Sequence, residues 1–373
     1  MTPRRIAVWR LHSQHLAGWR PPDPASTVAS MLAIQAENPS QSAWAVATRT
    51  APPAVPPSAG EVVPKPLSEN DIGHSLDAGE FLRTHVIRPT WHYVHPDDIR
   101  WLIEVTAPGV RRPFAYQAQT LGLDSTTLTR ALDVVLNALA EAHLTRAQLG
   151  ERLAAQGLPS AGQPLMLVMG LAEQDQLVCS GVRQGSTQTY ALLHQRAPTA
   201  RRLDRDQALA ELALRYFTGH GPATAKDLAY WATLPLGEVS SGLAAVRDRL
   251  ESFDLDGRTF WFGRPEPDPP IDHPAPRAHL LQLLDEYYRG YQDSRWMLDA
   301  DGLLTPGREP AVGMLVIDGQ VVGRMRRAVT ARAVRFDVEL LRPVRDDERD
   351  ATERAARRYG AFVEREVDLR LTS

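Results

Sequence analysis

Residues 128–153 read LTRALDVVLNALAEAHLTRAQLGERL, and residues 208–232 read ALAELALRYFTGHGPATAKDLAYWA. In both stretches a segment with helical spacing of apolar residues leads into a turn with a threonine, and a short helical segment follows. The threonines, Thr145 and Thr224, stand where the N-cap of that second helix belongs, with a leucine one turn later. The two stretches lie about 79 residues apart, so they predict a tandem repeat of one structural unit.

Each stretch is followed by the same two features. A further amphipathic segment comes first, at residues 164–178 and 238–250, and an alternating pattern around a turn comes second. The turns are marked by Gly185 and by Asp256-Gly257, of which the second is the stronger hairpin signal. Three helices and a hairpin in this order predict a winged helix.

A winged helix usually binds nucleic acid, because its third helix fits the major groove and its hairpin, the wing, contacts phosphate. Arg183 in the first wing and Arg258 in the second are therefore candidate phosphate contacts. Two alternatives stay open: winged helices also mediate protein contacts, and arginines on exposed faces can be merely solvated. The net charge of −3 does not itself indicate nucleic-acid binding, so such binding has to come from local patches.

The last hundred residues show a different pattern. Residues 279–298, HLLQLLDEYYRGYQDSRWML, predict an aromatic-rich helix or a helix and loop. From about Ala311 the apolar residues recur with period two around the turn Asp318-Gly319, which predicts a small antiparallel sheet or barrel. Residues 346–366 predict a final helix that packs over the sheet. The sheet segment carries a cluster of arginines with few balancing acids: Arg324, Arg326, Arg327, Arg332 and Arg335.

These patterns predict an α+β fold in which at least two winged helices precede a C-terminal sheet or barrel. Proline-rich connectors at 52–66 and 265–276 are predicted to be loops. The predicted domains are 1–120, 121–200, 201–275 and 276–373.

The composition excludes several classes of protein. The 373 residues are 43% apolar and 23% charged, which is typical of a globular protein of two or three domains. No segment approaches the roughly 20 apolar residues of a membrane helix, and the start of the chain lacks a secretory signal, so we expect a cytoplasmic protein without a membrane partner. The single cysteine, Cys179, excludes an internal disulfide and a cysteine metal cluster. No nucleotide-binding glycine motif and no metal-spaced histidines occur, so neither a cofactor nor a metal is predicted.

The strongest candidate site lies in the first domain. Residues 26–34 predict an amphipathic helix, and Pro39 disfavours a helix just before it, so Gln35, Ala36 and Glu37 are expected at the helix end. Positions i and i+2 share no face within a helix, but a frayed last turn or an extended exit brings both side chains into one cleft. Glu37 can then orient or deprotonate a water, and Gln35 can hydrogen-bond the water or a sugar. A solvated helix end is the alternative.

A second candidate is the aromatic segment of the same domain. Trp91, His92 and Tyr93 alternate as in a strand, which puts the tryptophan and the tyrosine on one face and the histidine on the other. Aromatic side chains near a basic groove can stack on an unstacked base or wedge a duplex. Packing in the core, together with Trp44 and Trp101, is the alternative for the aromatic residues, and His92 can equally be a buried histidine.

Three strings, taken together, resemble a known family. They are LAIQAENPSQSAWAVATRT at 32–50, HVIRPTWHYVHPDDIRWL at 85–102 and LLDEYYRGYQDS at 283–294. With the tandem repeat, they resemble the AlkZ-like family of bacterial winged-helix DNA glycosylases, over nearly the whole chain. The resemblance implies three winged helices, the first within residues 1–120, and a C-terminal β-barrel that line a basic channel for duplex DNA.

The resemblance also implies an activity, the monofunctional hydrolysis of the N-glycosidic bond of N7-alkylated purines, in some members within interstrand crosslinks. The family's catalytic motif, glutamine, an apolar residue, then glutamine or aspartate, falls on Gln35, Ala36 and Glu37. Glutamate keeps the carboxylate of the aspartate form and extends it by one methylene. The implied partner is double-stranded DNA with alkylated purines, and the implied form is a monomer associated with the nucleoid. The chain has two lysines, Lys65 and Lys226. With so few candidate amine nucleophiles, no lyase activity is expected.

Two other classes remain as alternatives. A non-enzymatic regulator with the same winged helices would prefer one DNA sequence and release no base. A protein-interaction module would show no salt-dependent affinity for DNA.

Overall fold

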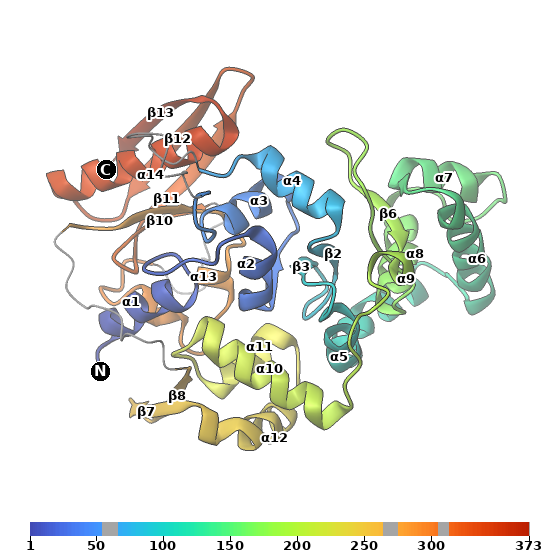
Figure 1. Ribbon diagram of the computed structural model, residues 1–373, viewed down its shortest axis with the longest axis horizontal. Helices are drawn as coiled ribbons and strands as arrows, with labels where there is room; N and C mark the ends of the chain where they lie inside the picture. The colour runs from blue at the N-terminus through green and yellow to red at the C-terminus, as the bar shows by residue number, and fades with distance from the viewer. Residues whose placement is uncertain (54–65, 264–274, 305–312, 373) are drawn as a thin grey trace.

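The computed structural model describes residues 1–53, 66–263, 275–304 and 313–372, which form an α+β fold (Figure 1). The predicted connectors at 52–66 and 265–276 lie almost wholly outside these residues. The α-helices are α1 (Pro3–Ser13), α2 (Pro24–Met31), α3 (Pro39–Ala47), α4 (Glu69–Ala78), α5 (Ile99–Thr120), α6 (Ser125–Glu141), α7 (Arg146–Ala154), α8 (Gly162–Gln174), α9 (Leu193–Arg196), α10 (Arg205–His220), α11 (Ala225–Ala232), α12 (Leu236–Val246), α13 (Glu286–Arg289) and α14 (Asp346–Val363). The strands are β1 (Ala33–Gln35), β2 (Leu82–His85), β3 (Trp91–Val94), β4 (Leu144–Thr145), β5 (Val178–Ser180), β6 (Thr189–Leu192), β7 (Glu251–Leu255), β8 (Arg258–Phe262), β9 (Ala278–Leu281), β10 (Gly313–Ile317), β11 (Gln320–Val329), β12 (Ala333–Leu340) and β13 (Glu366–Thr372).

The N-terminal part corrects the prediction of a helix over 26–34. Helix α2 begins earlier, because the Asp23 side chain accepts the Ser26 N–H at 2.7 Å and so caps it. It also ends earlier, since Leu32 has a φ of 64°, which no continuing helix allows. The next residues form strand β1 of the sheet β1-β3-β2. Gln35 therefore lies on a strand instead of a helix end.

The central part contains the predicted repeated elements. The N-caps of α7 and α11 are Thr145 and Thr224, and each is part of a capping box with the side chain three residues later. Strands β5 and β6 pair after α8, and β7 and β8 pair after α12. Asp256 and Gly257 both have positive φ, as a tight hairpin turn requires. The predicted helices, caps and hairpins at these positions are confirmed.

The C-terminal part is a curled five-stranded sheet in the order β13-β12-β11-β10-β9. The predicted hairpin turn at Asp318-Gly319 is present, and α14 packs on the sheet. Two predictions are wrong here. Residues 279–281, at the start of the predicted helix, belong instead to strand β9, because they pair with residues 314–316 of β10. The sheet is not wholly antiparallel either, because α14 carries the chain back so that β13 runs parallel to β12.

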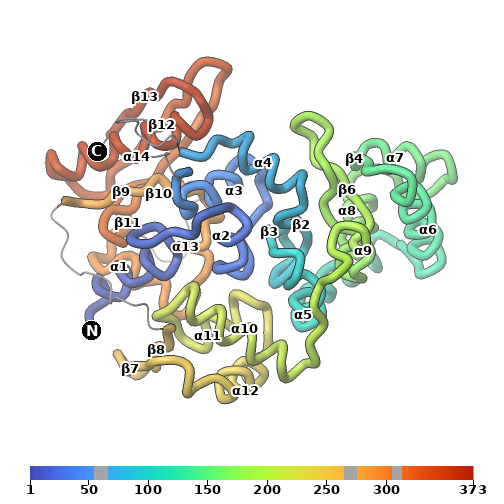
Figure 2. Tube along the Cα trace, in the orientation of Figure 1, coloured from blue at the N-terminus to red at the C-terminus, as the bar shows by residue number. Residues whose placement is uncertain are grey.

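The parts are arranged around the first sheet. Helices α6 and α7 lie farthest out on one side, and α8 joins them to α5 and β2, while α10 to α12 lie on another side of the N-terminal elements (Figures 1 and 2). Of the three tryptophans expected in the core, Trp44 and Trp101 are buried, and Trp91 is only partly so. Helix α13, which follows the C-terminal strand β9, lies next to β1 and brings distant residues to the candidate site.

Candidate active site

The Gln35-Ala36-Glu37 motif runs along and just beyond strand β1. Gln35 pairs with His92 of β3, and the Ala36 N–H donates to the Trp91 carbonyl oxygen at 2.7 Å. Glu37 then leaves the sheet with an exposed side chain, and its Oε2 accepts the Trp91 N–H at 3.3 Å. Of the two predicted geometries, the chain adopts the extended exit.

A small pocket brings the two polar side chains together. Gln35 and Glu37 line it with residues of α3 and with Asp285 and Glu286 of the segment before and within α13. Gln35 is only 6% exposed, and its side-chain Oε1 makes no hydrogen bond to any described residue. A buried oxygen without a donor is costly unless a water or ligand supplies one. The pocket is therefore lined by one residue with an exposed carboxylate and by another whose buried side-chain oxygen is unsatisfied.

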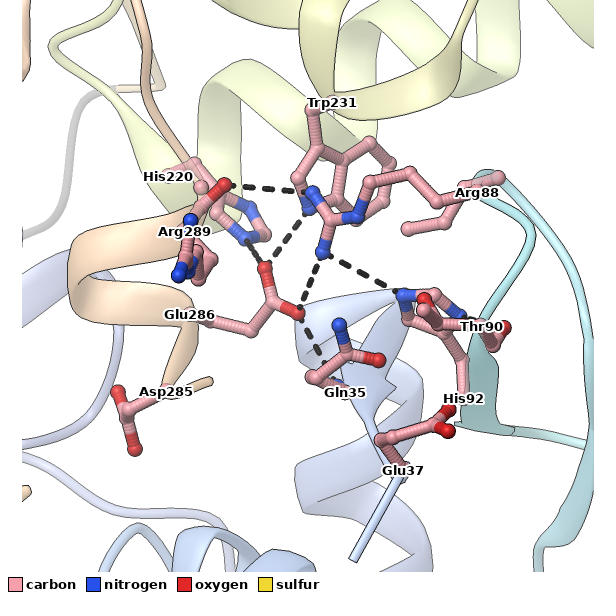
Figure 3. A network of polar contacts seen from close by, with 12 residues as sticks. Gln35, Glu37, Arg88, Thr90, His92, His220, Trp231, Asp285, Glu286 and Arg289 are labelled. Carbon is pink, nitrogen blue, oxygen red and sulfur yellow. Dashed lines mark hydrogen bonds and ion pairs between the residues drawn. The ribbon is translucent and has the colours of Figure 1, made fainter. Parts of the chain in front are cut away.

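Glu286 forms the buried wall behind Gln35 (Figure 3). Its side chain is fully buried, and its Oε1 accepts the Gln35 main-chain N–H at 3.0 Å. Its Oε2 accepts the indole N–H of Trp231 at 2.8 Å. Arg88 Nη2 lies 3.5 Å from Oε1, and His220 Nε2 lies 3.7 Å from Oε2. Burial alone would raise the pKa of Glu286, but the His220 side chain and the Arg88 charge outweigh it and lower the pKa to about 2.

Arg88 connects this carboxylate to the neighbouring strand. Its Nη2 also lies 3.4 Å from Nε2 of His92, and its Nη1 donates to the Arg289 carbonyl oxygen at 3.2 Å. Burial, with the Arg88 charge beside the ring, lowers the pKa of His92 to about 3, so the imidazole is neutral at pH 7. A neutral ring can donate from Nδ1 to the Thr90 carbonyl oxygen, 2.9 Å away, and accept from Arg88 at Nε2.

Asp285 holds the same segment from the other side. Its carboxylate accepts two hydrogen bonds from the buried guanidinium of Arg49, at 2.6 and 3.0 Å. It also caps α13 by accepting the Tyr287 N–H at 2.9 Å. Arg49 lies just after α3, so this pair ties α13 to the helix that follows the motif.

The comparisons with known proteins bear on the whole chain. The family profile described as "DNA glycosylase AlkZ-like" matches residues 28–362. The chain belongs to this family. The solved structure of the Streptomyces sahachiroi DNA glycosylase AlkZ superposes with a TM-score of 0.74 at 18% identity, over 100% of both chains, and shows that the fold is shared. No curated protein sequence matches.

Membership in the AlkZ-like family makes the protein a DNA glycosylase, a DNA-repair enzyme whose substrate is DNA. No helix within the described residues is both long and apolar enough to span a membrane. Across the same residues, no group of three or more histidine, cysteine and acidic side chains is arranged to hold a metal ion.

The three aromatic candidates, Trp91, His92 and Tyr93, are packed against other side chains of the protein. Tyr93 is 2% exposed and packs against Phe81, and His92 is fully buried behind Gln35. Trp91 is partly exposed, its indole N–H donates to Glu173 at 3.2 Å, and the Arg83 guanidinium lies over its ring. Of the three residues, Trp91 alone is partly exposed.

The predicted phosphate contacts lie on other elements than the motif, and most have acidic partners. Arg183 is paired with Asp77 of α4 at 2.9 Å, and Arg258 with Asp293 at 3.3 Å. On the sheet, Arg324 lies 3.7 Å from Glu339, the Arg327 guanidinium lies over the Tyr359 ring, and Arg326 is exposed.

Sequence reasoning missed the acidic wall of the pocket. Asp285 and Glu286 were part of one string of the family resemblance, but no role was predicted for them. An adjacent pair of acids among aromatic residues was the available signal, because such residues are seldom buried without a partner. Their partners are far away in sequence: Arg49, Arg88, His220 and Trp231.

Proposed function

We propose that this AlkZ-like DNA glycosylase is a monofunctional enzyme that hydrolyses the N-glycosidic bond of N7-alkylated purines, with Glu37 and Gln35 in its site. The observation that carries the proposal is the pocket itself. It combines the exposed carboxylate of Glu37, held by the Trp91 N–H, with the buried, unsatisfied Oε1 of Gln35. The two groups suit a reaction that places and deprotonates one water.

The chemistry needs little more than these two groups. An N7-alkylguanine is cationic, so when its C1′–N9 bond breaks, the electron pair enters the base and neutralises it without prior protonation. The sugar becomes an oxocarbenium-like cation, which the Glu37 carboxylate stabilises. Water adds to C1′ and gives its proton to Glu37, while Gln35 Oε1 accepts the water's other hydrogen.

The lysines support a hydrolytic, monofunctional enzyme. A lyase step needs an amine nucleophile near the sugar. Lys226 is exposed on α11 and does not line the pocket, and Lys65 lies outside the described residues. Hydrolysis therefore ends at the abasic site.

The architecture proposed for the DNA complex has three winged helices in domains 1–120, 121–200 and 201–275, followed by domain 276–373. The recurring order of helices and a hairpin in α6 to β6 and in α10 to β8 supports the second and third. An exposed Glu37 suits an open channel, which would admit bulky adducts and interstrand crosslinks without full base flipping. We propose a monomer that acts on the nucleoid.

A product analysis tests this proposal. Wild-type protein is incubated with a duplex that carries one N7-methylguanine, and the products are identified by mass spectrometry. We expect free N7-methylguanine, an unbroken abasic strand that alkali cleaves, and no adduct trapped by borohydride. Sequence-selective binding without base release would instead favour the non-enzymatic regulator, and a borohydride-trapped adduct would contradict the monofunctional mechanism.

A further inference from the structure

The segment 283–294, LLDEYYRGYQDS, contributes a buried carboxylate to the site, and the reaction described above gives that carboxylate no role. Glu286 touches neither the water nor the sugar in that reaction. It is nevertheless fully buried against the main chain of the catalytic motif, where it accepts the Gln35 N–H at 3.0 Å. Burying a charge is costly, so a buried carboxylate at this place is expected to have a structural role that offsets the cost.

The position of β1 in its sheet supplies that reason. In the order β1-β3-β2 it is an edge strand, and β3 covers one side only. The Ala36 N–H points to β3 and reaches the Trp91 carbonyl oxygen, so the Gln35 N–H, one residue earlier, points away from the sheet. Among the described residues no strand pairs with β1 on that side, and the Glu286 carboxylate takes the place of a strand's carbonyl oxygen.

The carboxylate is itself held from three directions. Trp231 of α11 donates to Oε2, His220 of α10 lies beside it, and Arg88 approaches Oε1 (Figure 3). Arg88 then reaches His92, the register partner of Gln35 on β3. The contacts therefore form a closed ring that crosses from β1 through Glu286 and Arg88 to β3.

We propose that Glu286 is a positioning residue for base excision, which fixes the main chain at Gln35 and so sets where the Gln35 and Glu37 side chains stand in the pocket. The inference rests on the proposed function only for its kinetic consequence. Its structural content, that Glu286 protects and fixes the Gln35 amide, holds whatever the enzyme's substrate is.

The test is the Glu286→Gln variant of the full chain. A glutamine turns its amide NH₂ toward one of two donors, the Gln35 or the Trp231 N–H, and leaves the Arg88 charge uncompensated. We expect the single-turnover rate of base release to fall about 10- to 100-fold, the size of effect that a displacement of about 1 Å produces, while the Kd for the lesion duplex stays within about threefold. Hydrogen exchange of the peptide that contains Gln35 should become at least about tenfold faster.

The matched control is Glu348→Gln. Glu348 is similarly buried and bound by Arg342 at 2.8 Å, but it lies at the start of α14 and does not line the pocket. It should lower stability without changing base release or exchange at Gln35. If Glu286→Gln does not fold, Trp231→Phe removes the indole donor, together with one ring of a buried side chain, and should produce the same two changes at smaller size.

The outcomes separate the two proposals. If wild-type protein releases no base, the proposed function fails, and exchange at Gln35 alone decides the role of Glu286. Unchanged exchange in a folded Glu286→Gln protein overturns the inference, whatever the rate does. Equal losses in Glu286→Gln and Glu348→Gln also overturn it, because they would be a general effect of lower stability.

Discussion

Glu37 is held in the pocket through the hydrogen bond that its Oε2 accepts from the Trp91 main chain at 3.3 Å. Its neighbour two residues earlier, Gln35, is buried and keeps one side-chain oxygen unsatisfied. The difference in exposure suits the two proposed roles, because the exposed carboxylate of Glu37 can pass its proton on to solvent and the buried amide of Gln35 can hold the reacting water in one orientation.

Removal of the Gln35 side chain should slow base release without weakening DNA binding. Gln35→Ala deletes one hydrogen bond to the reacting water, so we expect the single-turnover rate to fall about tenfold or more. Gln41→Ala is the matched control, because Gln41 lines the same pocket from α3 and has no part in the mechanism. Equal rates for Gln35→Ala and wild type would show that the amide does not orient the water.

The buried imidazole of His92 should make the fold sensitive to acid. Its folded pKa of about 3 lies below the usual 6.5, so the unfolded chain binds a proton that the folded chain excludes, and stability is lost as pH falls from about 6.5 toward 3. Between pH 7.5 and 5 this costs about 2 kcal/mol. Chemical denaturation at both pH values should show that His92→Asn reduces the difference by this amount, while His74→Asn, at an exposed histidine, does not. An unchanged difference in His92→Asn would show that the ring is protonated in the folded protein.

At the scale of elements, local signals predicted much of the fold. The threonine caps of α7 and α11 and the Asp-Gly turns follow from short-range chemistry that needs no distant partner. Local signals did not predict strand β9 or the end of α2. Strand β9 forms because it pairs with β10, and α2 ends where β1 begins to pair with β3, and both partners are far away in sequence. Gln35 and Glu37 were proposed as a pair from the sequence, with the extended exit as one of two geometries. The place of Gln35 on an edge strand and the acidic wall were not predicted, because they too depend on residues far away in sequence.

The N-cap of α7 should make a measurable contribution to the free energy of unfolding. The Thr145 hydroxyl accepts the Gln148 N–H, so Thr145→Ala should lower the free energy of unfolding by about 1 kcal/mol. Thr129→Ala, at an exposed position within α6, should change it by less than about 0.5 kcal/mol. An unchanged free energy of unfolding in Thr145→Ala would mean that tertiary packing alone stabilises α7.

The surface of the whole molecule offers several arginines that could contact DNA. With a net charge of −3, binding depends on cations that have no acidic partner within the protein. Arg183 forms an ion pair with Asp77 and so joins the β5–β6 hairpin to α4, whereas the side chain of Arg326 on the C-terminal sheet is exposed. Among the predicted contacts, we therefore expect the sheet arginine to meet phosphate.

The salt dependence of DNA binding tests this assignment. Arg326→Ala should lower the slope of log Kd against log salt by about one, because one phosphate contact is lost. Arg183→Ala should leave the slope unchanged, since its charge is already neutralised by Asp77. The opposite result, a change in slope for Arg183→Ala alone, would place the DNA along the hairpin instead of the sheet.

The role of Glu37 as the general base is tested by single-turnover base release from a duplex with one N7-methylguanine, compared between wild-type protein and Glu37→Ala, with the Kd measured in parallel. We predict that the variant loses at least about 100-fold in rate, the typical contribution of a general base, and binds the duplex as tightly as wild type. Base release at the wild-type rate by Glu37→Ala would show that Glu37 is not the general base.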